Sequence, residues 1–191
     1  MKFDTQSVSR DIADSRSRSQ ALVDGVSADQ LMRRPDPGKW SIAECLAHLN
    51  ITAATVQKLM ARGIEQAKQE KKFGSGPFSI GSKGRLMIWI AEPPPKFRIR
   101  APKNVRPPAA IDDPLRMLSA FMKAQDEWER LMREQEGLDL AAIKVGQGAF
   151  RMRLAAALPW MMAHQRRHLL QAENVKRQIV SAAPTIAAQA G

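Results

Sequence analysis

The sequence predicts an all-α protein, a four-helix bundle with a long Pro-rich, basic crossover between its second and third helices. Apolar residues recur at three- to four-residue spacing in four stretches, and two segments match the capping-box pattern. Between the second and third stretches lie roughly 45 residues, divided by prolines, which is too long for a simple antiparallel turn. The 191-residue chain suits one domain, predicted over residues 1–180, followed by a frayed tail over residues 181–191.

The first predicted helix runs from about Ser7 to Val26 and has few apolar positions. Residues 27–30, Ser-Ala-Asp-Gln, then match a capping box, which predicts a short helical turn over Leu31 and Met32. This turn should end at the helix-breaking residues Pro35, Pro37 and Gly38.

The second helix begins at another capping box, residues 41–44, in which the Ser41 hydroxyl accepts from the backbone N–H of Glu44. One apolar face follows it at helical spacing: Cys45, Leu49, Thr52, Val56 and Met60. The helix should end near Gly63 or a little later, because glycine favours helix ends.

The third and fourth helices also carry start and stop signals. Asp113 is the expected N-cap of the third helix, with Pro114 at its first position and Gly137 as its stop. The fourth helix is predicted over Phe150–Val180. Because Pro159 lies inside it, a kink or a restart of the helix is expected there.

The formal net charge of +11 is concentrated in the crossover, where residues 71–106 carry nine basic side chains and one acidic one. A short helix is predicted over Arg85–Ala91 and an extended segment over Lys96–Arg100. Three roles are open: polyanion binding, a pocket mouth that attracts an anionic substrate or thiol, or a solvated loop, which we favour. The prolines and the absence of Tyr argue against nucleic acid.

Composition and the chain's start restrict the compartment. Cys45 is the one cysteine, so no internal disulfide forms. The longest apolar run, residues 154–163, is too short to span a membrane, and we expect no membrane partner. The first residues contain no secretory signal, so a cytoplasmic protein is expected. A homodimer through an exposed helix face stays open.

The three histidines of the chain are its main functional signal. His164 and His168 are four residues apart on one predicted helix, so their rings project from the same side. His48 lies at the edge of the inward face of the second helix, so the three imidazoles could meet. Imidazole binds zinc, nickel, copper and ferrous iron, and three ligands with open positions are typical of a catalytic site. The alternative is a set of hydrogen-bonded core histidines without metal.

Two segments resemble signatures of the DinB/YfiT-like superfamily. Residues 37–49, Pro-Gly-Lys-Trp-Ser-Ile-Ala-Glu-Cys-Leu-Ala-His-Leu, resemble its second helix, and residues 164–171, His-Gln-Arg-Arg-His-Leu-Leu-Gln, resemble its fourth. The resemblance implies an up-down-down-up bundle that binds one divalent metal ion through His48, His164 and His168. Zinc or nickel is expected first, with manganese or iron as alternatives.

The resemblance also implies an activity. Relatives include transferases and isomerases that use low-molecular-weight thiols such as bacillithiol, mycothiol or glutathione. We therefore expect a thiol-dependent S-transferase that acts on a small-molecule substrate. One alternative is a metal-dependent hydrolase, and another is a non-catalytic bundle that binds an anionic partner through the crossover. No separate general base can be named from the sequence.

Further side chains are candidates for supporting such a site. Glu44, one turn before His48, could orient that ring, although the capping box is the preferred explanation for it. Gln171 could contact a substrate or a metal-bound water, or simply be a polar interface residue. Arg167 could pair with a substrate carboxylate, or be solvated or paired with an acidic residue. Cys45 is expected to be a small buried residue rather than a reactive thiolate.

Overall fold

The computed structural model describes residues 1–97 and 100–181, without the side chain of Ala149, and confirms the mostly helical class. The α-helices of this part are α1 (Thr5–Val23), α2 (Ala28–Met32), α3 (Ile42–Gln69), α4 (Gly81–Ala91), α5 (Pro114–Glu134) and α6 (Leu154–Ser181). It also contains the 3₁₀ turns η1 (Lys103–Val105) and η2 (Gly148–Phe150), and an antiparallel hairpin of β1 (Lys144–Val145) and β2 (Met152–Arg153). The sequence analysis did not predict this hairpin.

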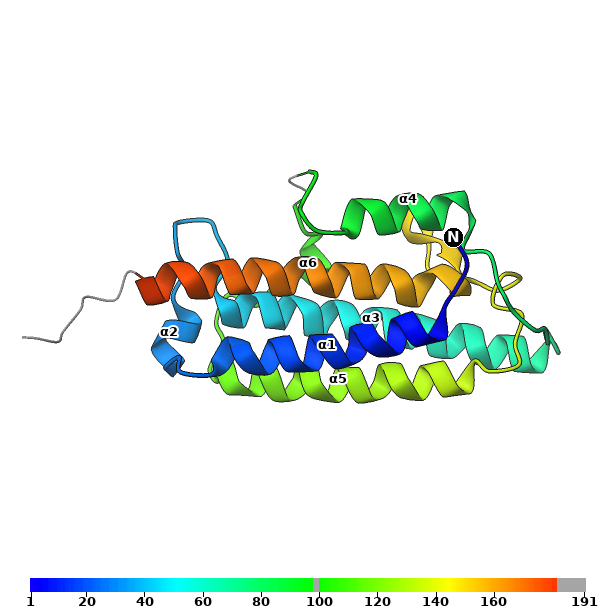
Figure 1. The fold of residues 1–191 in the computed structure, drawn as a ribbon, viewed down its shortest axis with the longest axis horizontal. Coiled ribbons are helices and arrows are strands. Elements are labelled where there is room, and N and C mark those ends of the chain that lie inside the picture. The colour runs from blue at the N-terminus through cyan, green and yellow to red at the C-terminus, as the bar shows by residue number, and fades with distance from the viewer. Residues whose placement is uncertain (98–99, 182–191) are drawn as a thin grey trace, which may run out of the picture.

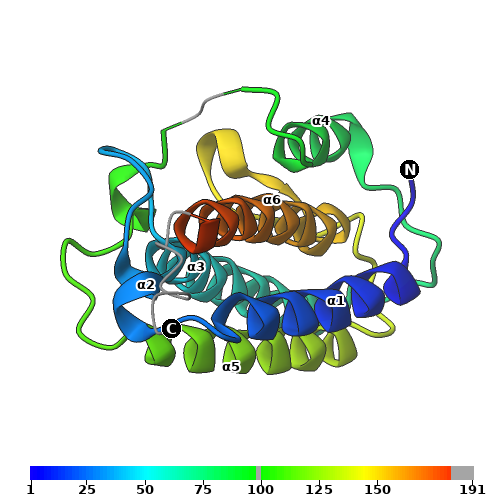
Figure 2. The ribbon, with the colours of Figure 1, turned by 60° about the vertical axis from the view of Figure 1, so that its left-hand side comes forward.

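The long helices α1, α3, α5 and α6 lie side by side along the molecule (Figure 1). Helix α3 packs against α5 and α6, and α1 packs against the same two helices. The colours show that α1 and α6 run in one direction, whereas α3 and α5 run in the other (Figure 1). Helix α4 lies outside this group, against α6 (Figure 2).

The start of α3 is set by the predicted capping box, which is confirmed. The Ser41 hydroxyl accepts from the backbone N–H of Glu44 at 3.1 Å, and the Glu44 carboxylate accepts from the backbone N–H of Ser41 at 2.8 Å. Both donors would otherwise lack partners at the helix end. His48 follows less than two turns later and is buried. A local sequence signal therefore positions the first of the three histidines.

The end of α3 lies at Gln69, about a turn and a half beyond Gly63. Gly63 has a different role, because a Cβ atom there would lie 2.6 Å from Cγ1 of Val145 in β1. The buried residues Ile64 and Ala67 continue the inward face past it. This glycine therefore permits close packing of the hairpin and does not end the helix.

The beginning of α6 differs from the prediction. The expected start at Phe150 is wrong, because residues 150–153 complete η2 and form β2, and α6 begins at Leu154. The helix does not restart at Pro159, since it is continuous to Ser181. Pro159 is the sixth residue of α6, so it removes one backbone hydrogen bond within the first turns. His164 and His168 therefore lie on one uninterrupted helix.

Two other helices begin earlier than predicted. Helix α1 begins at Thr5 because Asp4 caps it, accepting from the backbone N–H of Gln6 at 3.0 Å. Helix α4 begins at Gly81, four residues before the predicted start at Arg85. The predicted turn over Leu31 and Met32 is confirmed as α2, with both halves of its capping box present.

Two predictions extend outside the described residues. The extended segment Lys96–Arg100 includes residues 98–99, and the frayed tail includes residues 182–191. Ser181, the first residue of that tail, ends α6. Among the described residues, no helix combines the length and the apolar character needed to cross a membrane.

Candidate metal centre

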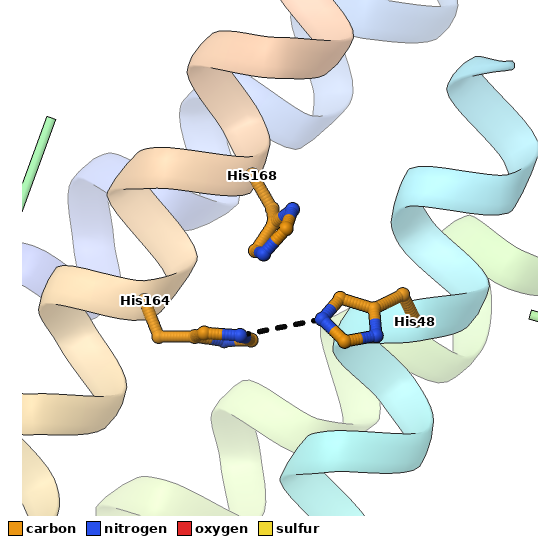
Figure 3. A group of neighbouring side chains, drawn as sticks. All are labelled: His48, His164 and His168. Carbon is orange, nitrogen blue, oxygen red and sulfur yellow. Dashed lines mark hydrogen bonds between the residues drawn. The ribbon is translucent and has the colours of Figure 1, made fainter. Parts of the chain in front are cut away.

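The three histidines come together between α3 and α6 (Figure 3). Each ring offers one nitrogen, and these three atoms all lie within 4.8 Å of one another. The Nε2 atoms of His48 and His164 are 3.3 Å apart, and the ring centroid of His168 lies 4.5 Å from that of His48. The arrangement follows from the spacing on α6, where His164 and His168 are one turn apart and both rings point toward α3.

Hydrogen bonds fix the orientation of two of the rings. Nδ1 of His48 donates to the backbone carbonyl of Val105 in η1 at 2.6 Å. Nδ1 of His168 donates to Oε1 of Gln171 at 3.0 Å. In each neutral ring the proton then lies on Nδ1, so Nε2 keeps its lone pair, as metal-binding histidines require. Nδ1 of His164 is buried and has no hydrogen-bond partner among the described residues.

The donor set fits a first-row divalent ion. In a tetrahedral zinc site with Zn–N distances of about 2.0–2.1 Å, two ligating nitrogens lie about 3.3 Å apart. The Nε2 atoms of His48 and His164 are 3.3 Å apart, which is close to this spacing and is also a hydrogen-bond distance (Figure 3). All three ligand nitrogens lie within 4.8 Å of one another. Neutral imidazoles suit zinc, nickel, copper and iron better than the oxygen-seeking calcium and magnesium ions. The three histidines could therefore hold a metal ion, with positions left for other ligands.

Two tryptophans flank the histidines. The ring of Trp40 lies 4.9 Å from that of His48 and 5.8 Å from that of His168, measured between centroids. The ring of Trp160 stacks on His164, with a centroid distance of 5.6 Å. Aromatic rings at these distances shield the imidazoles from water and restrict their rotation. Trp160 is partly buried against the hydrophobic core and also contributes to the wall of the site.

The surroundings keep the three imidazoles uncharged at neutral pH. Burial lowers the pKa of His48, although its bond to the Val105 carbonyl opposes the change. Burial and the nearby charges of His168, His48 and Arg167 hold the pKa of His164 well below its usual value. Burial, His48 and Arg167 lower the pKa of His168 to about 3. Neutral rings with free lone pairs are the state that binds metal.

These lowered pKa values predict that the metal-free protein loses stability in acid. The unfolded chain binds protons at its histidines below about pH 6.5, whereas the folded chain resists doing so. A histidine whose pKa is lowered on folding should lower the free energy of unfolding by about 1.4 kcal/mol for each pH unit between its unfolded and its folded pKa. For His168 this window extends from about pH 6.5 to about pH 3.

Denaturant unfolding in the presence of a chelator, at several pH values from 7.5 to 4.5, measures this slope. The variant His168→Gln removes one titrating group, so its slope should be shallower than that of the wild type by about 1.4 kcal/mol per pH unit. Identical slopes in the two proteins would contradict the neutral state of His168 in the folded protein.

The hydrogen bonds of the Glu44 carboxylate go to groups other than His48. Its carboxylate accepts from the Ser41 backbone and from the guanidinium of Arg34, with Arg34 Nε to Glu44 Oε2 at 2.9 Å. Burial alone would raise the pKa of Glu44, but the bonds from Arg34 and Ser41 outweigh it and lower this pKa. The geometry thus matches the preferred capping explanation. The group that orients His48 is instead the Val105 carbonyl, a backbone atom that no sequence motif marks.

The remaining candidates also have defined surroundings. Arg167 donates to the carbonyls of Ile90 at 3.0 Å and Phe97 at 2.8 Å, and it has no carboxylate partner among the described residues. Its neighbour Arg166 is different, because it pairs with both Asp11 and Glu92. Arg167 therefore ties α4 and the crossover to α6 and keeps an unneutralised charge near the histidines.

Cys45 is fully buried, and burial raises the pKa of its thiol. The charge of Glu44 raises it further. This environment suits the small buried residue expected from the sequence and not a reactive thiolate.

Comparison with known families gives an independent result. The sequence profile of the DinB superfamily matches residues 11–172, which is most of the chain and includes all three histidines. The chain belongs to the DinB superfamily. The resemblance noted in the sequence is therefore confirmed, and the DinB superfamily is associated with metal binding. Neither a search of the curated proteins nor a search of the solved structures found a match to this chain.

Proposed function

We propose that this DinB protein is a metal-dependent enzyme of the thiol-dependent S-transferase type. It would hold one divalent ion, zinc or nickel, through His48, His164 and His168, in a four-helix bundle of up-down-down-up order. The observation that carries the proposal is the convergence of three imidazole nitrogens within 4.8 Å of one another. Three neutral ligands leave positions for a substrate atom, which favours a catalytic role over a closed structural site.

The chain's own residues supply orientation and shielding. The Val105 carbonyl and the Gln171 amide oxygen hold two imidazoles with Nε2 facing the centre. Trp40 and Trp160 cover the rings and exclude water. A bound divalent ion would act as a Lewis acid and lower the pKa of a thiol or water bound to it.

Arg167 is the proposed contact for an anionic part of the substrate. A guanidinium has five N–H donors, and two of those of Arg167 are used by the carbonyls of Ile90 and Phe97. The remaining donors and the unneutralised charge suit a carboxylate. Its charge also lowers the pKa values of His164 and His168, so it lies close enough to act at the same centre.

An activity screen tests the proposed reaction. The zinc- and nickel-loaded proteins are assayed with bacillithiol, mycothiol or glutathione and an electrophilic acceptor, by following thiol consumption. We expect turnover that is lost in His48→Ala, and a higher KM for a carboxylate-bearing thiol in Arg167→Leu. Thiol-independent cleavage of an ester or amide by the same loaded protein would instead assign the hydrolase alternative. A metal-loaded protein inactive with every thiol would contradict the transferase proposal.

Gln171 should act as a positioning residue for His168. The variant Gln171→Leu removes the acceptor of the Nδ1 proton, and loss of such an outer partner costs about 10–100-fold in metal affinity. Competition with a chromophoric chelator measures this change. The variant Gln171→Glu keeps an acceptor oxygen and should restore affinity to near the wild-type value. Equal affinities for Gln171→Leu and the wild type would show that this hydrogen bond does not orient the ligand.

A further inference from the structure

One face of α4 is fixed against the helix group. Gly84, Ile88 and Ala91 are buried on this face. A Cβ atom at Gly84 would lie 2.6 Å from the Cβ of Ala156 in α6, so the two helices approach each other closely here. The opposite face of α4 must therefore point away from α6, to the outside of the molecule (Figure 2).

The outward face of α4 carries large apolar side chains. Leu86 is 54% exposed and Trp89 is 51% exposed, and they lie three residues apart on the same side of the helix. Phe97, 52% exposed, packs edge-to-face on Trp89 with a centroid distance of 6.1 Å. These three residues form a contiguous apolar group, and single scattered apolar side chains are the usual pattern on a protein surface.

Cations border this apolar group. Lys83, Arg85 and Lys96 are exposed; the first two flank Leu86 and Trp89 along α4, and Lys96 precedes Phe97. Nζ of Lys96 is 5.3 Å from the centre of the Trp89 ring, and Nζ of Lys83 is 3.4 Å from the Gly148 carbonyl oxygen. The sole acidic residue of segment 71–106 is Glu92, and Arg166 engages it on the α6 side. We call Leu86, Trp89, Phe97 and these three cations the α4 surface.

We propose that the α4 surface docks the protein on an anionic lipid membrane. Apolar residues with Trp at the centre and Lys or Arg at the border are typical of helices that lie in the membrane interface. Long basic side chains can reach lipid phosphates while Leu86 and Trp89 enter the boundary of the acyl chains. This proposal replaces the expectation from the sequence that there is no membrane partner. That expectation rested on the lack of a segment long enough to span a bilayer, and peripheral docking does not need one.

The charge and the side-chain types of the α4 surface favour a lipid membrane over a second copy of the chain or a nucleic acid strand. A second copy of the chain would place one segment of net charge +8 (nine basic, one acidic) against another, which is repulsive. A single nucleic acid strand would use the aromatic rings for stacking, but the aliphatic Leu86 offers no such platform. An anionic bilayer satisfies the apolar side chains and the cations together.

Vesicle binding tests the proposal with the full-length protein. The probes are vesicles of phosphatidylcholine alone and vesicles with phosphatidylglycerol added, and binding is followed by co-sedimentation and tryptophan fluorescence. Trp89 is the one exposed tryptophan. Trp128 is buried, and Trp40 and Trp160 are partly buried. We expect a blue shift with anionic vesicles alone, which weakens with added salt and disappears in Trp89→Ala.

Matched charge variants complete the test. Neutralising Lys83 and Arg85 to Gln should weaken binding about 25-fold, at about fivefold for each cation. The control neutralises the exposed Lys58 and Lys123, on α3 and α5, and should bind as the wild type does. Equal weakening in both variants would overturn the proposal, and so would equal binding to neutral vesicles. Preferential, Trp89-dependent binding of single-stranded DNA would overturn it in favour of a nucleic acid. Far-UV circular dichroism confirms that each variant is folded.

Discussion

Replacement of His48 by alanine should abolish stoichiometric metal binding. The wild-type protein, purified without a tag and incubated with zinc or nickel at neutral pH, should carry about one ion per chain, as three neutral ligands permit. Without His48, two imidazoles one turn apart on α6 remain. The loss of metal affinity should be larger than the loss of about 10–100-fold that is expected when an outer partner such as Gln171 is removed. Elemental analysis gives the stoichiometry, and chelator competition gives the affinity.

The matched control for this experiment lies one turn further along α3. Thr52 is buried, and its hydroxyl donates to the His48 carbonyl at 2.8 Å, but it offers no ligand to the centre. The variant Thr52→Ala should therefore bind one ion as the wild type does. A wild-type protein that takes up no divalent ion, or a His48→Ala variant that keeps its ion, would contradict the metal centre. Three core histidines would then be the better description.

Replacement of Trp128 by alanine should lower the free energy of unfolding by about 3–5 kcal/mol. Trp128 is completely buried on α5 within the main hydrophobic core. Truncation to Cβ removes the largest side chain of that core and leaves a cavity that the surrounding helices fill only in part. Denaturant unfolding with chelator present measures the change without a contribution from bound metal.

The conservative variant Trp128→Phe gives a sharper test. The indole Nε1 of Trp128 is buried and has no hydrogen-bond partner among the described residues. An unpaired buried donor costs about 1–3 kcal/mol, and phenylalanine removes the donor while filling most of the volume. Trp128→Phe should therefore cost far less than Trp128→Ala. Equal losses would contradict both the unpaired state of the indole N–H and the cavity as the main cost of Trp128→Ala.

The features that could be predicted from the sequence depend on residues close together in the chain. The capping box at Ser41 and Glu44 fixes the start of α3 within a few residues, and this start sets where His48 points. The spacing of His164 and His168 places both rings on one side of any helix that contains them. Neither inference needs knowledge of distant segments, so both could be made from a single sequence.

The features that the sequence did not predict depend on contacts between distant segments. The acceptor for His48 is a carbonyl 57 residues away in η1, and a backbone carbonyl is the same in every residue type. In the sequence, Gly63 has the pattern of a helix end. Its actual role depends on its contact with Val145 of the hairpin, which the sequence does not indicate. The start of α6 at Leu154 depends on the same kind of contact, because β2 forms only by pairing with β1.

The bond between His48 and the Val105 carbonyl has a consequence for how this protein tolerates change. A substitution at Val105 leaves the carbonyl in place, so the side chain there is free to vary. An insertion or deletion beside it would carry the acceptor away from Nδ1 and release the ring. What is constrained in this segment is therefore its length and the path of its backbone, and not its residue types. Relatives that keep the three histidines are expected to differ freely in residue type here while conserving the spacing into η1.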